Sequence, residues 1–204
     1  MIKQLTVTGR IIVNKYKKLS IVYDKDLLDF VSKLNFTITP LNLDNKINYN
    51  LLKESKGLII SGGGDIYKVS KKKIDKIRDD IELKLYNYFK KQNKPILAIC
   101  RGYQLIINFN GSSVKKIKDH VRKSHDLKII NSKFINLKKI NVNSFHKFGL
   151  FNNVNNFKKT GFHNDGSIEI LEHKTKKILC VMFHPERTMK SQKKIFSEII
   201  KFFR

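Results

Sequence analysis

Apolar residues recur along this chain in two spacings, a helical period and short runs typical of buried strands. Apolar stripes predict helices over 24–34, 71–91 and 191–203, with shorter helices at 50–55 and 102–109. The short runs predict strands at 2–7, 36–41, 57–60, 96–100, 125–130, 134–137, 139–142, 167–171 and 177–183. Strands that alternate with helices and are followed by further strands predict a three-layer α/β sandwich with a largely parallel central sheet. No repeat or linker interrupts the pattern, so we expect residues 1–204 to form a single domain.

The amino-acid composition bears mainly on which partners and which cellular location are expected. The net charge is +25, but lysine is spread along the whole chain with abundant asparagine and isoleucine, as in proteins of AT-rich genomes. No known nucleic-acid-binding motif is present, which argues against nucleic-acid binding as the main function. A basic surface would still attract a phosphorylated substrate. Two cysteines, no signal-peptide layout and no long apolar run predict a cytoplasmic protein without a membrane partner.

The first candidate for chemistry is Cys100, at the end of the predicted strand 96–100. Ala98 and Gly102 flank it, and small residues are what a tight strand-to-helix turn requires. A side chain on such a turn lies at the amino end of a helix, where backbone N–H groups favour a thiolate. A small buried packing residue is the alternative interpretation. Cys180 has no such glycine beside it, and we interpret it as a packing residue.

Two further strand ends carry candidate groups, and the carboxyl ends of parallel strands meet at one edge of a sheet. The glycine loop 62–64 is either an ordinary turn or a backbone N–H donor facing an oxyanion. His184 and Glu186 follow the last predicted strand. Taken alone, His184 could be an ordinary surface or core histidine, and Glu186 a solvated surface charge. Together they supply a general base and the carboxylate that orients it, as nucleophilic catalysis requires.

At these positions the chain resembles the class I glutamine amidotransferases, which have a flavodoxin-like fold, and more narrowly the γ-glutamyl hydrolase family of cysteine peptidases. The motifs that carry the resemblance are Ile99-Cys100-Arg101-Gly102-x-Gln104, Ser61-Gly62-Gly63-Gly64-Asp65, Phe183-His184-Pro185-Glu186, Arg78-Asp79-x-x-Glu82, His120, His125, Val142-Asn143-Ser144-x-His146 and Asp165-Gly166-x-Ile168-Glu169.

The resemblance implies a role for each matching residue. Cys100 would be the nucleophile, His184 its base and later acid, and Glu186 the group that orients His184. The backbone N–H groups of Gly63 and Arg101 would form the oxyanion hole. The residues expected to bind substrate are Gly62, Gly64, Gln104, Asn143, Ser144 and His146. No metal and no cofactor is expected for this chemistry.

The implied reaction is attack on a γ-glutamyl amide carbonyl, a thioester intermediate, and release of glutamate by water. Segments 7–10, 143–148 and 182–187 look most like members that cleave a γ-glutamyl phosphoramidate of CDP in surface-polysaccharide modification. Arg101, Arg187 or nearby lysines would then bind the diphosphate. Phe145 and Phe148 are either substrate contacts or core residues, and Arg187 is otherwise a surface charge.

Two other functions stay open at this point. The chain lacks a Walker-type phosphate loop and a synthetase domain, so it is either a stand-alone hydrolase or a glutaminase subunit that supplies ammonia to a partner synthase. The second alternative is a catalytically inactive binding module. The presence of Cys100, His184 and Glu186 argues against an inactive module.

Overall fold

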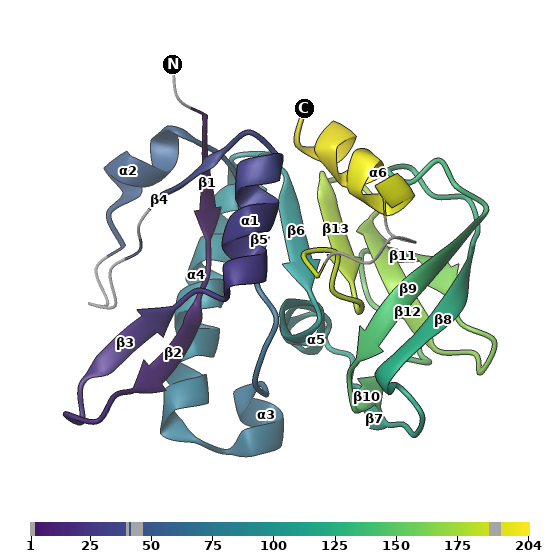
Figure 1. The fold of residues 1–204 in the computed structure, drawn as a ribbon, viewed down its shortest axis with the longest axis horizontal. Coiled ribbons are helices and arrows are strands. Elements are labelled where there is room, and N and C mark those ends of the chain that lie inside the picture. Colours follow the sequence, from purple (N-terminus) through teal and green to yellow (C-terminus); the bar gives the residue numbers. More distant parts are fainter. Residues whose placement is uncertain (1–2, 40, 42–46, 188–192) are drawn as a thin grey trace.

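The computed structural model describes residues 3–39, 41, 47–187 and 193–204. Within these residues, a nine-stranded sheet forms the centre of the molecule (Figure 1). Its parallel part consists, in spatial order, of β4 (Thr37–Thr39), β1 (Gln4–Val7), β5 (Ser55–Ile60), β6 (Ile96–Ile99) and β13 (Ile178–Val181). An antiparallel part continues the sheet through β12 (Ile168–His173), β11 (Phe157–Phe162), β8 (Val121–Ile129) and β9 (Lys139–Phe145).

Helices cover both faces of the parallel strands. They are α1 (Lys25–Lys33), α2 (Tyr49–Lys53), α3 (Tyr67–Ser70), α4 (Lys73–Lys91), α5 (Arg101–Phe109) and α6 (Lys193–Phe203). Because side chains alternate along a strand, β6 contributes to two cores. Leu97 and Ile99 pack with α1 and α6, while Ile96 and Ala98 pack with α4 and α5. The predicted three-layer α/β architecture is confirmed.

Two strand pairs and one further strand were not predicted from the sequence. A hairpin of β2 (Arg10–Val13) and β3 (Leu19–Val22) projects from the parallel part of the sheet (Figure 1). A second small pair joins β7 (Lys115–Lys116) to β10 (Phe148–Gly149). The further strand is β11, where two adjacent lysines, Lys158 and Lys159, interrupt the apolar signal.

The predicted strand at 134–137 is wrong. Its backbone N–H groups bond to side chains instead of to a neighbouring strand: Ile135 donates to Ser132 Oγ at 2.8 Å and Asn136 donates to Glu198 Oε2 at 2.7 Å. Phe134 packs edge-on against Phe202 of α6, with ring centroids 5.0 Å apart. The apolar residues of this segment therefore anchor a loop to a helix.

Several boundaries differ from those predicted. The helix expected over 71–91 is one helix, α4, but it begins two residues later, because Lys71 ends the separate, unpredicted helix α3 in the left-handed region with φ of 59°. Strand β8 begins four residues before the predicted 125, and β9 continues three residues beyond the predicted 142. Parts of three predicted elements, at residue 2, residue 40 and residues 191–192, lie outside the described residues.

No helix among the described residues combines the length and the apolar character that crossing a lipid bilayer requires.

Candidate active site

Cys100 lies on the predicted turn, between the end of β6 and the first residue of α5. Its backbone has φ of 49° and ψ of −96°, a conformation that non-glycine residues rarely adopt and that surrounding packing must maintain. Gly102 makes the turn feasible, because a Cβ there would lie 2.5 Å from the carbonyl oxygen of Ile60. The close approach of α5 to β5 thus holds the thiol at the sheet edge.

His184 is buried beside this turn and is oriented from two sides. Its Nδ1 lies 2.6 Å from Glu186 Oε1. The Asn143 amide bonds the backbone of His184 twice, donating to its carbonyl oxygen and accepting from its N–H, both at 2.8 Å. Burial disfavours a charged ring, but hydrogen bonds to the Cys100 and Glu186 side chains prevail and raise the pKa of His184 to about 9. A cationic imidazole beside Cys100 is the partner that a nucleophilic thiolate needs.

The glycine loop completes the group of predicted strand ends. A Cβ on Gly62 would lie 2.7 Å from Cε1 of His184 and 3.4 Å from the Cβ of Cys100, so its backbone contacts both catalytic residues. Gly63 and Gly64 have φ of +84° and +77°, which only glycine adopts readily. The three strand ends that the sequence singled out do meet at one edge of the sheet.

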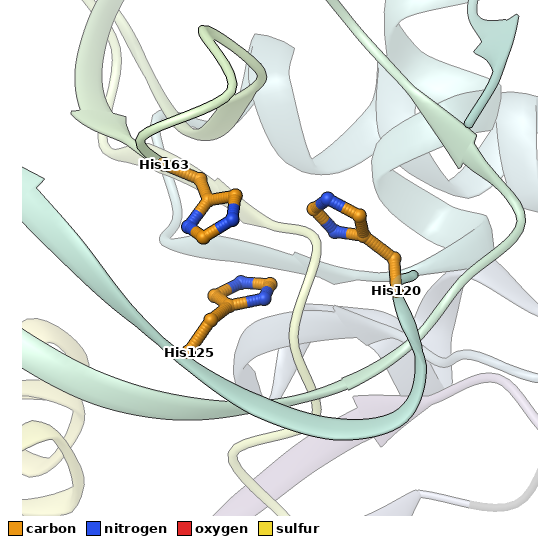
Figure 2. A group of neighbouring side chains, drawn as sticks. All are labelled: His120, His125 and His163. Carbon is orange, nitrogen blue, oxygen red and sulfur yellow. The ribbon is translucent and has the colours of Figure 1, made fainter. Parts of the chain in front are cut away.

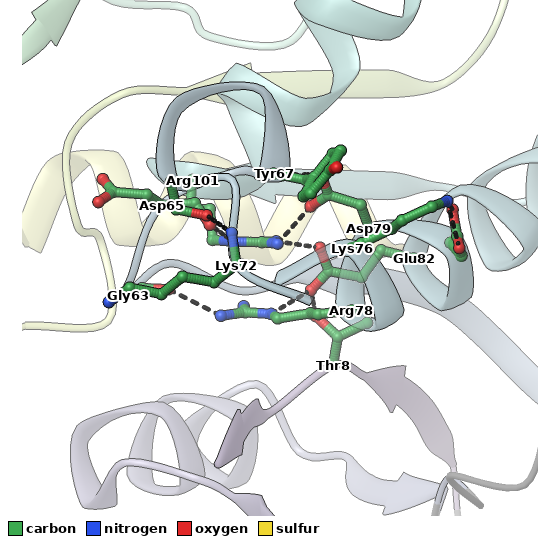
Figure 3. Close-up of polar contacts among 12 residues, drawn as sticks. Thr8, Gly63, Asp65, Tyr67, Lys72, Lys76, Arg78, Asp79, Glu82 and Arg101 are labelled. Atoms are coloured by element: carbon green, nitrogen blue, oxygen red, sulfur yellow. Dashed lines mark hydrogen bonds and ion pairs between the residues drawn. The ribbon is translucent and has the colours of Figure 1, made fainter. Parts of the chain in front are cut away.

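Arg78 of α4 determines which way this loop faces (Figure 3). Its guanidinium donates to the carbonyl oxygens of Ser61, Gly62 and Gly63 at 3.0, 3.1 and 2.7 Å. In a trans peptide the carbonyl and the following N–H point in opposite directions. The Gly63 N–H is therefore turned away from Arg78. The sequence marked Arg78 as part of a family motif but assigned it no role.

The Arg101 side chain is fully buried in the same polar network (Figure 3). It forms ion pairs with Asp79 and Glu82, and its Nε donates to the carbonyl oxygen of Asp65 at 3.0 Å. Glu82 also accepts from Arg78 Nε at 2.8 Å. Burial opposes ionisation of Glu82, but the charges of the two arginines hold its pKa below the ordinary value. The expectation that the Arg101 side chain contacts a diphosphate is wrong, because two buried carboxylates occupy its guanidinium.

Two residues expected to bind substrate lie near the catalytic residues with their amides already engaged. Gln104, one turn along α5, is buried and its Nε2 lies 3.8 Å from Met182 Sδ. Asn143 uses its amide to hold the His184 backbone. Asn143 is thus placed to position the catalytic histidine.

The side chains of Ser144 and His146 do not lie at the catalytic turn that carries Cys100. Ser144 Oγ donates to the carbonyl oxygen of His120 at 2.6 Å, and both residues are buried. His146 has no exposed side-chain surface, and its Nδ1 lies 2.9 Å from the carbonyl oxygen of Phe148. Neighbouring residues of an extended segment point to opposite sides. Ser144 therefore points away from the side on which Asn143 contacts His184, and lies with His120 in a separate buried group.

Phe145 points to the same side as Asn143 and lies at the surface beside His184. The residue is 38% exposed, and its ring centroid is 5.9 Å from that of His184. The guanidinium carbon of Arg187 lies 4.5 Å from the Phe145 ring centroid. Phe145 and Arg187, two of the three residues that the sequence left open, therefore form an aromatic and cationic rim next to the catalytic base.

Cys180 contrasts with Cys100. It is fully buried in β13 within the core that α4 and α5 cover, and burial raises the pKa of its thiol. Its predicted role as a packing residue is confirmed.

Comparison with known proteins supports the sequence resemblance. The Peptidase C26 family profile matches residues 30–186. The chain is 31% identical to γ-glutamyl-CDP-amidate hydrolase of Campylobacter jejuni over 167 residues, which is 81% of this chain and 76% of that protein. It is also 32% identical to a subunit of the glutamine-hydrolysing GMP synthase of Methanocaldococcus jannaschii over 164 residues, covering 76% and 74% of the two chains.

The fold has relatives among solved structures. A crystal structure described as that of a putative GMP synthase subunit from Thermoplasma acidophilum superimposes with a TM-score of 0.74 at 21% identity. The superposition covers 100% of this chain and 94% of that one. Since the family match spans well over half of the sequence, the protein belongs to the Peptidase C26 family and is a hydrolase of γ-glutamyl amide bonds, with the class I glutamine amidotransferase fold.

Proposed function

We propose that this protein is a stand-alone hydrolase that cleaves the γ-glutamyl C–N bond of a nucleotide-linked substrate through a thioester on Cys100. The observation that carries the proposal is the strained turn at Cys100, which places the thiol against the His184–Glu186 pair and the Gly62 backbone. Nucleophile, base and orienting carboxylate are the minimum set for acyl transfer by a cysteine.

In the first step, the Cys100 thiolate attacks the γ-carbonyl carbon of the substrate and a C–S bond forms. The carbonyl oxygen becomes an oxyanion, which the N–H groups of Gly63 and Arg101 would stabilise. Arg78 supports this assignment for Gly63, because it binds the Gly62 carbonyl of the same peptide and turns the N–H to the opposite side.

In the second step, the C–N bond breaks and the imidazolium of His184 gives its proton to the leaving nitrogen. Neutral His184 then takes a proton from water, whose oxygen attacks the thioester and releases glutamate. The thiolate of Cys100 and the proton on His184 are restored together, so the cycle balances. Glu186 holds the ring of His184 in place throughout.

A nucleotide leaving group is supported by two observations. The Phe145–Arg187 rim beside His184 offers an aromatic face for a base and a cation for a phosphate. The relative from Campylobacter jejuni is named for a γ-glutamyl-CDP-amidate substrate. As part of this proposal, we assign the reaction to surface-polysaccharide modification in the cytoplasm, where a nucleotide-activated phosphoramidate would be formed.

The test is a mass-spectrometric measurement of glutamate released from a panel of γ-glutamyl amides, including γ-glutamyl nucleotides and free glutamine. We expect the nucleotide-linked amides to be cleaved with a much higher kcat/KM than glutamine. Cys100→Ala is the control and should release no glutamate while keeping the wild-type circular dichroism spectrum. Equal rates on glutamine and on every γ-glutamyl nucleotide would refute the nucleotide assignment.

A second candidate function is that of the glutaminase chain in a two-chain amidotransferase. The relative from Methanocaldococcus jannaschii favours it, since that protein is named as part of a glutamine-hydrolysing synthase. This function predicts weak glutaminase activity alone and strong activation by a synthase partner. Rapid turnover of a γ-glutamyl nucleotide by the isolated chain would decide for the hydrolase.

A further inference from the structure

A second group of ionisable side chains lies in the antiparallel part of the sheet, apart from the catalytic residues. Four histidines and one glutamate come together there from separate segments of the chain. His125 belongs to β8 and Glu169 to β12, while His120, His146 and His163 lie at the ends of β8, β9 and β11. The rings of His120, His125 and His163 are turned toward one another (Figure 2). The catalytic mechanism uses none of these five residues.

Glu169 lies at the centre of this histidine cluster. Its Oε1 is 3.3 Å from His120 Nδ1, 2.9 Å from His125 Nε2 and 3.3 Å from His146 Nε2. In a tetrahedral zinc site with bonds of about 2.0–2.1 Å, neighbouring ligand atoms lie roughly 3.3 Å apart. The three distances from Glu169 Oε1 are therefore close to the spacing between neighbouring ligand atoms at a bound ion. The donor atoms form two groups that share His120: those of His120, His146 and Glu169 lie within 4.8 Å of one another, and so do those of His120, His125 and His163.

The outer nitrogens of three histidines are bonded to acceptors. His146 Nδ1 lies 2.9 Å from the Phe148 carbonyl oxygen, and His163 Nδ1 lies 3.2 Å from the Asp126 carbonyl oxygen. A carbonyl only accepts, so each of these nitrogens carries the hydrogen and the other nitrogen of a neutral ring has a free lone pair. His120 Nε2 likewise lies 2.8 Å from a carboxylate oxygen of Asp165. This arrangement of an inner lone pair and an outer N–H is what metal-binding histidines adopt.

The inner atoms are close together but are not aligned for hydrogen bonds. Among the described residues, none of the five inner atoms has a hydrogen-bond partner of acceptable geometry: His120 Nδ1, His125 Nε2, His146 Nε2 and both carboxylate oxygens of Glu169. The side chain of Glu169 is 1% exposed, so water does not solvate it freely. Burying a carboxylate against three lone pairs is costly unless a cation lies between them.

We propose that this cluster binds one divalent transition-metal ion of the zinc class. Its ligands are His120 Nδ1, His125 Nε2, His146 Nε2 and Glu169 Oε1, a nitrogen-rich set with one oxygen that suits Zn²⁺. His163 packs against His125 with ring centroids 4.1 Å apart and completes the wall of the site. The ion would join β8, β9 and β12 and takes no part in thioester chemistry, so this site is independent of the proposed substrate.

The experiment uses the full, tag-free chain after treatment with a strong chelator and desalting. We expect titration with Zn²⁺ to give one bound ion per chain by elemental mass spectrometry and a higher thermal midpoint. Co²⁺ in place of Zn²⁺ should give the intense visible absorption of tetrahedral cobalt. Glu169→Gln and His146→Gln should each weaken Zn²⁺ binding by at least about tenfold, because each removes one ligand.

His173→Gln is the matched control. His173 is also buried, but its Nδ1 accepts from the backbone of Thr175 and Lys176 in a turn outside the cluster, so this variant should keep full zinc stoichiometry. Absence of zinc binding by the wild-type chain would overturn the proposal, as would equal affinity of wild type and Glu169→Gln. If Glu169→Gln fails to fold, His125→Gln replaces it, since His125 lies at the less buried edge of the site. Unchanged zinc affinity in that variant would equally refute the assigned ligands.

Discussion

Arg78 binds the carbonyl oxygen of Gly62 at 3.1 Å, and that carbonyl shares its peptide plane with the N–H of Gly63. A buried cation 15 positions further along the chain thereby controls the direction of a backbone donor. Neighbouring bonds to Ser61 and Gly63 leave this loop little freedom to rotate. Preorganised donors of this kind contribute most to rate when charge develops on a substrate oxygen.

Arg78→Lys should therefore slow catalysis more than it weakens binding. Lysine keeps the positive charge near Glu82 but cannot donate to three carbonyls at once. We expect kcat to fall by about 10²-fold, the usual cost of one oxyanion donor, with little change in KM. Steady-state kinetics of glutamate release measure both constants. Lys76→Arg on the same helix is the control, because Lys76 pairs with Asp80 at the surface. A large change in KM alone would argue against the role given to Arg78.

The pKa of His184 predicts how activity depends on pH. It is raised to about 9 in the folded chain, above the ordinary 6.5, so His184 is protonated at neutral pH. The proton it gives to the leaving nitrogen is then lost as pH rises, and kcat/KM should decline through about pH 9. The stability that this shift contributes is complete below about pH 6.5 and is lost through about pH 9.

Glu186→Gln should shift the alkaline decline of kcat/KM to lower pH, since the Glu186 carboxylate is one of the two partners that raise the pKa of His184. It should also lower kcat/KM by at least about 10²-fold, because the ring loses its orienting charge. A pH–rate profile of wild type and variant separates the two effects. A decline of kcat/KM at the same alkaline pH in both proteins would contradict the role given to Glu186.

Gly102→Ala should damage the catalytic turn directly. Its new Cβ would lie 2.5 Å from the backbone oxygen of Ile60, so α5 must move away from β5. We expect a loss of about 1–3 kcal/mol in the free energy of unfolding together with most of the activity. Gly111→Ala is the control: its φ is +78°, but the site of the new Cβ is open. That variant should lose about 1–2 kcal/mol and keep its kcat.

Arg187→Ala tests the rim beside His184. If the guanidinium above Phe145 binds a phosphate, KM for a γ-glutamyl nucleotide should rise roughly tenfold, as expected for a charged hydrogen bond. KM for glutamine, which has no phosphate, should not change. Equal effects on both substrates would show that Arg187 acts through the structure of the His184 segment.

The catalytic residues could be predicted because each follows a strand, and the parallel topology brings strand ends together. The buried ion pairs of Glu82 with Arg78 and Arg101 could not be predicted, because charged residues on a helix usually face solvent. The positions of Ser144 and His146 depend on the side to which each residue points at the end of β9, which spacing alone does not reveal. The histidine cluster was missed for a similar reason. Its members come from strands whose pairing, such as His125 opposite Val142, appears only in the folded sheet.

The bond between Asn143 and the backbone of His184 links the two parts of the sheet in a way that bears on heat inactivation. Cys100 is held by the parallel strands, whereas the base depends on a strand at the far edge of the antiparallel part. Loosening that edge would free the histidine before the turn at Cys100 melts. A warmed sample should then lose turnover at a temperature where Cys100 is still inaccessible to bulky thiol reagents.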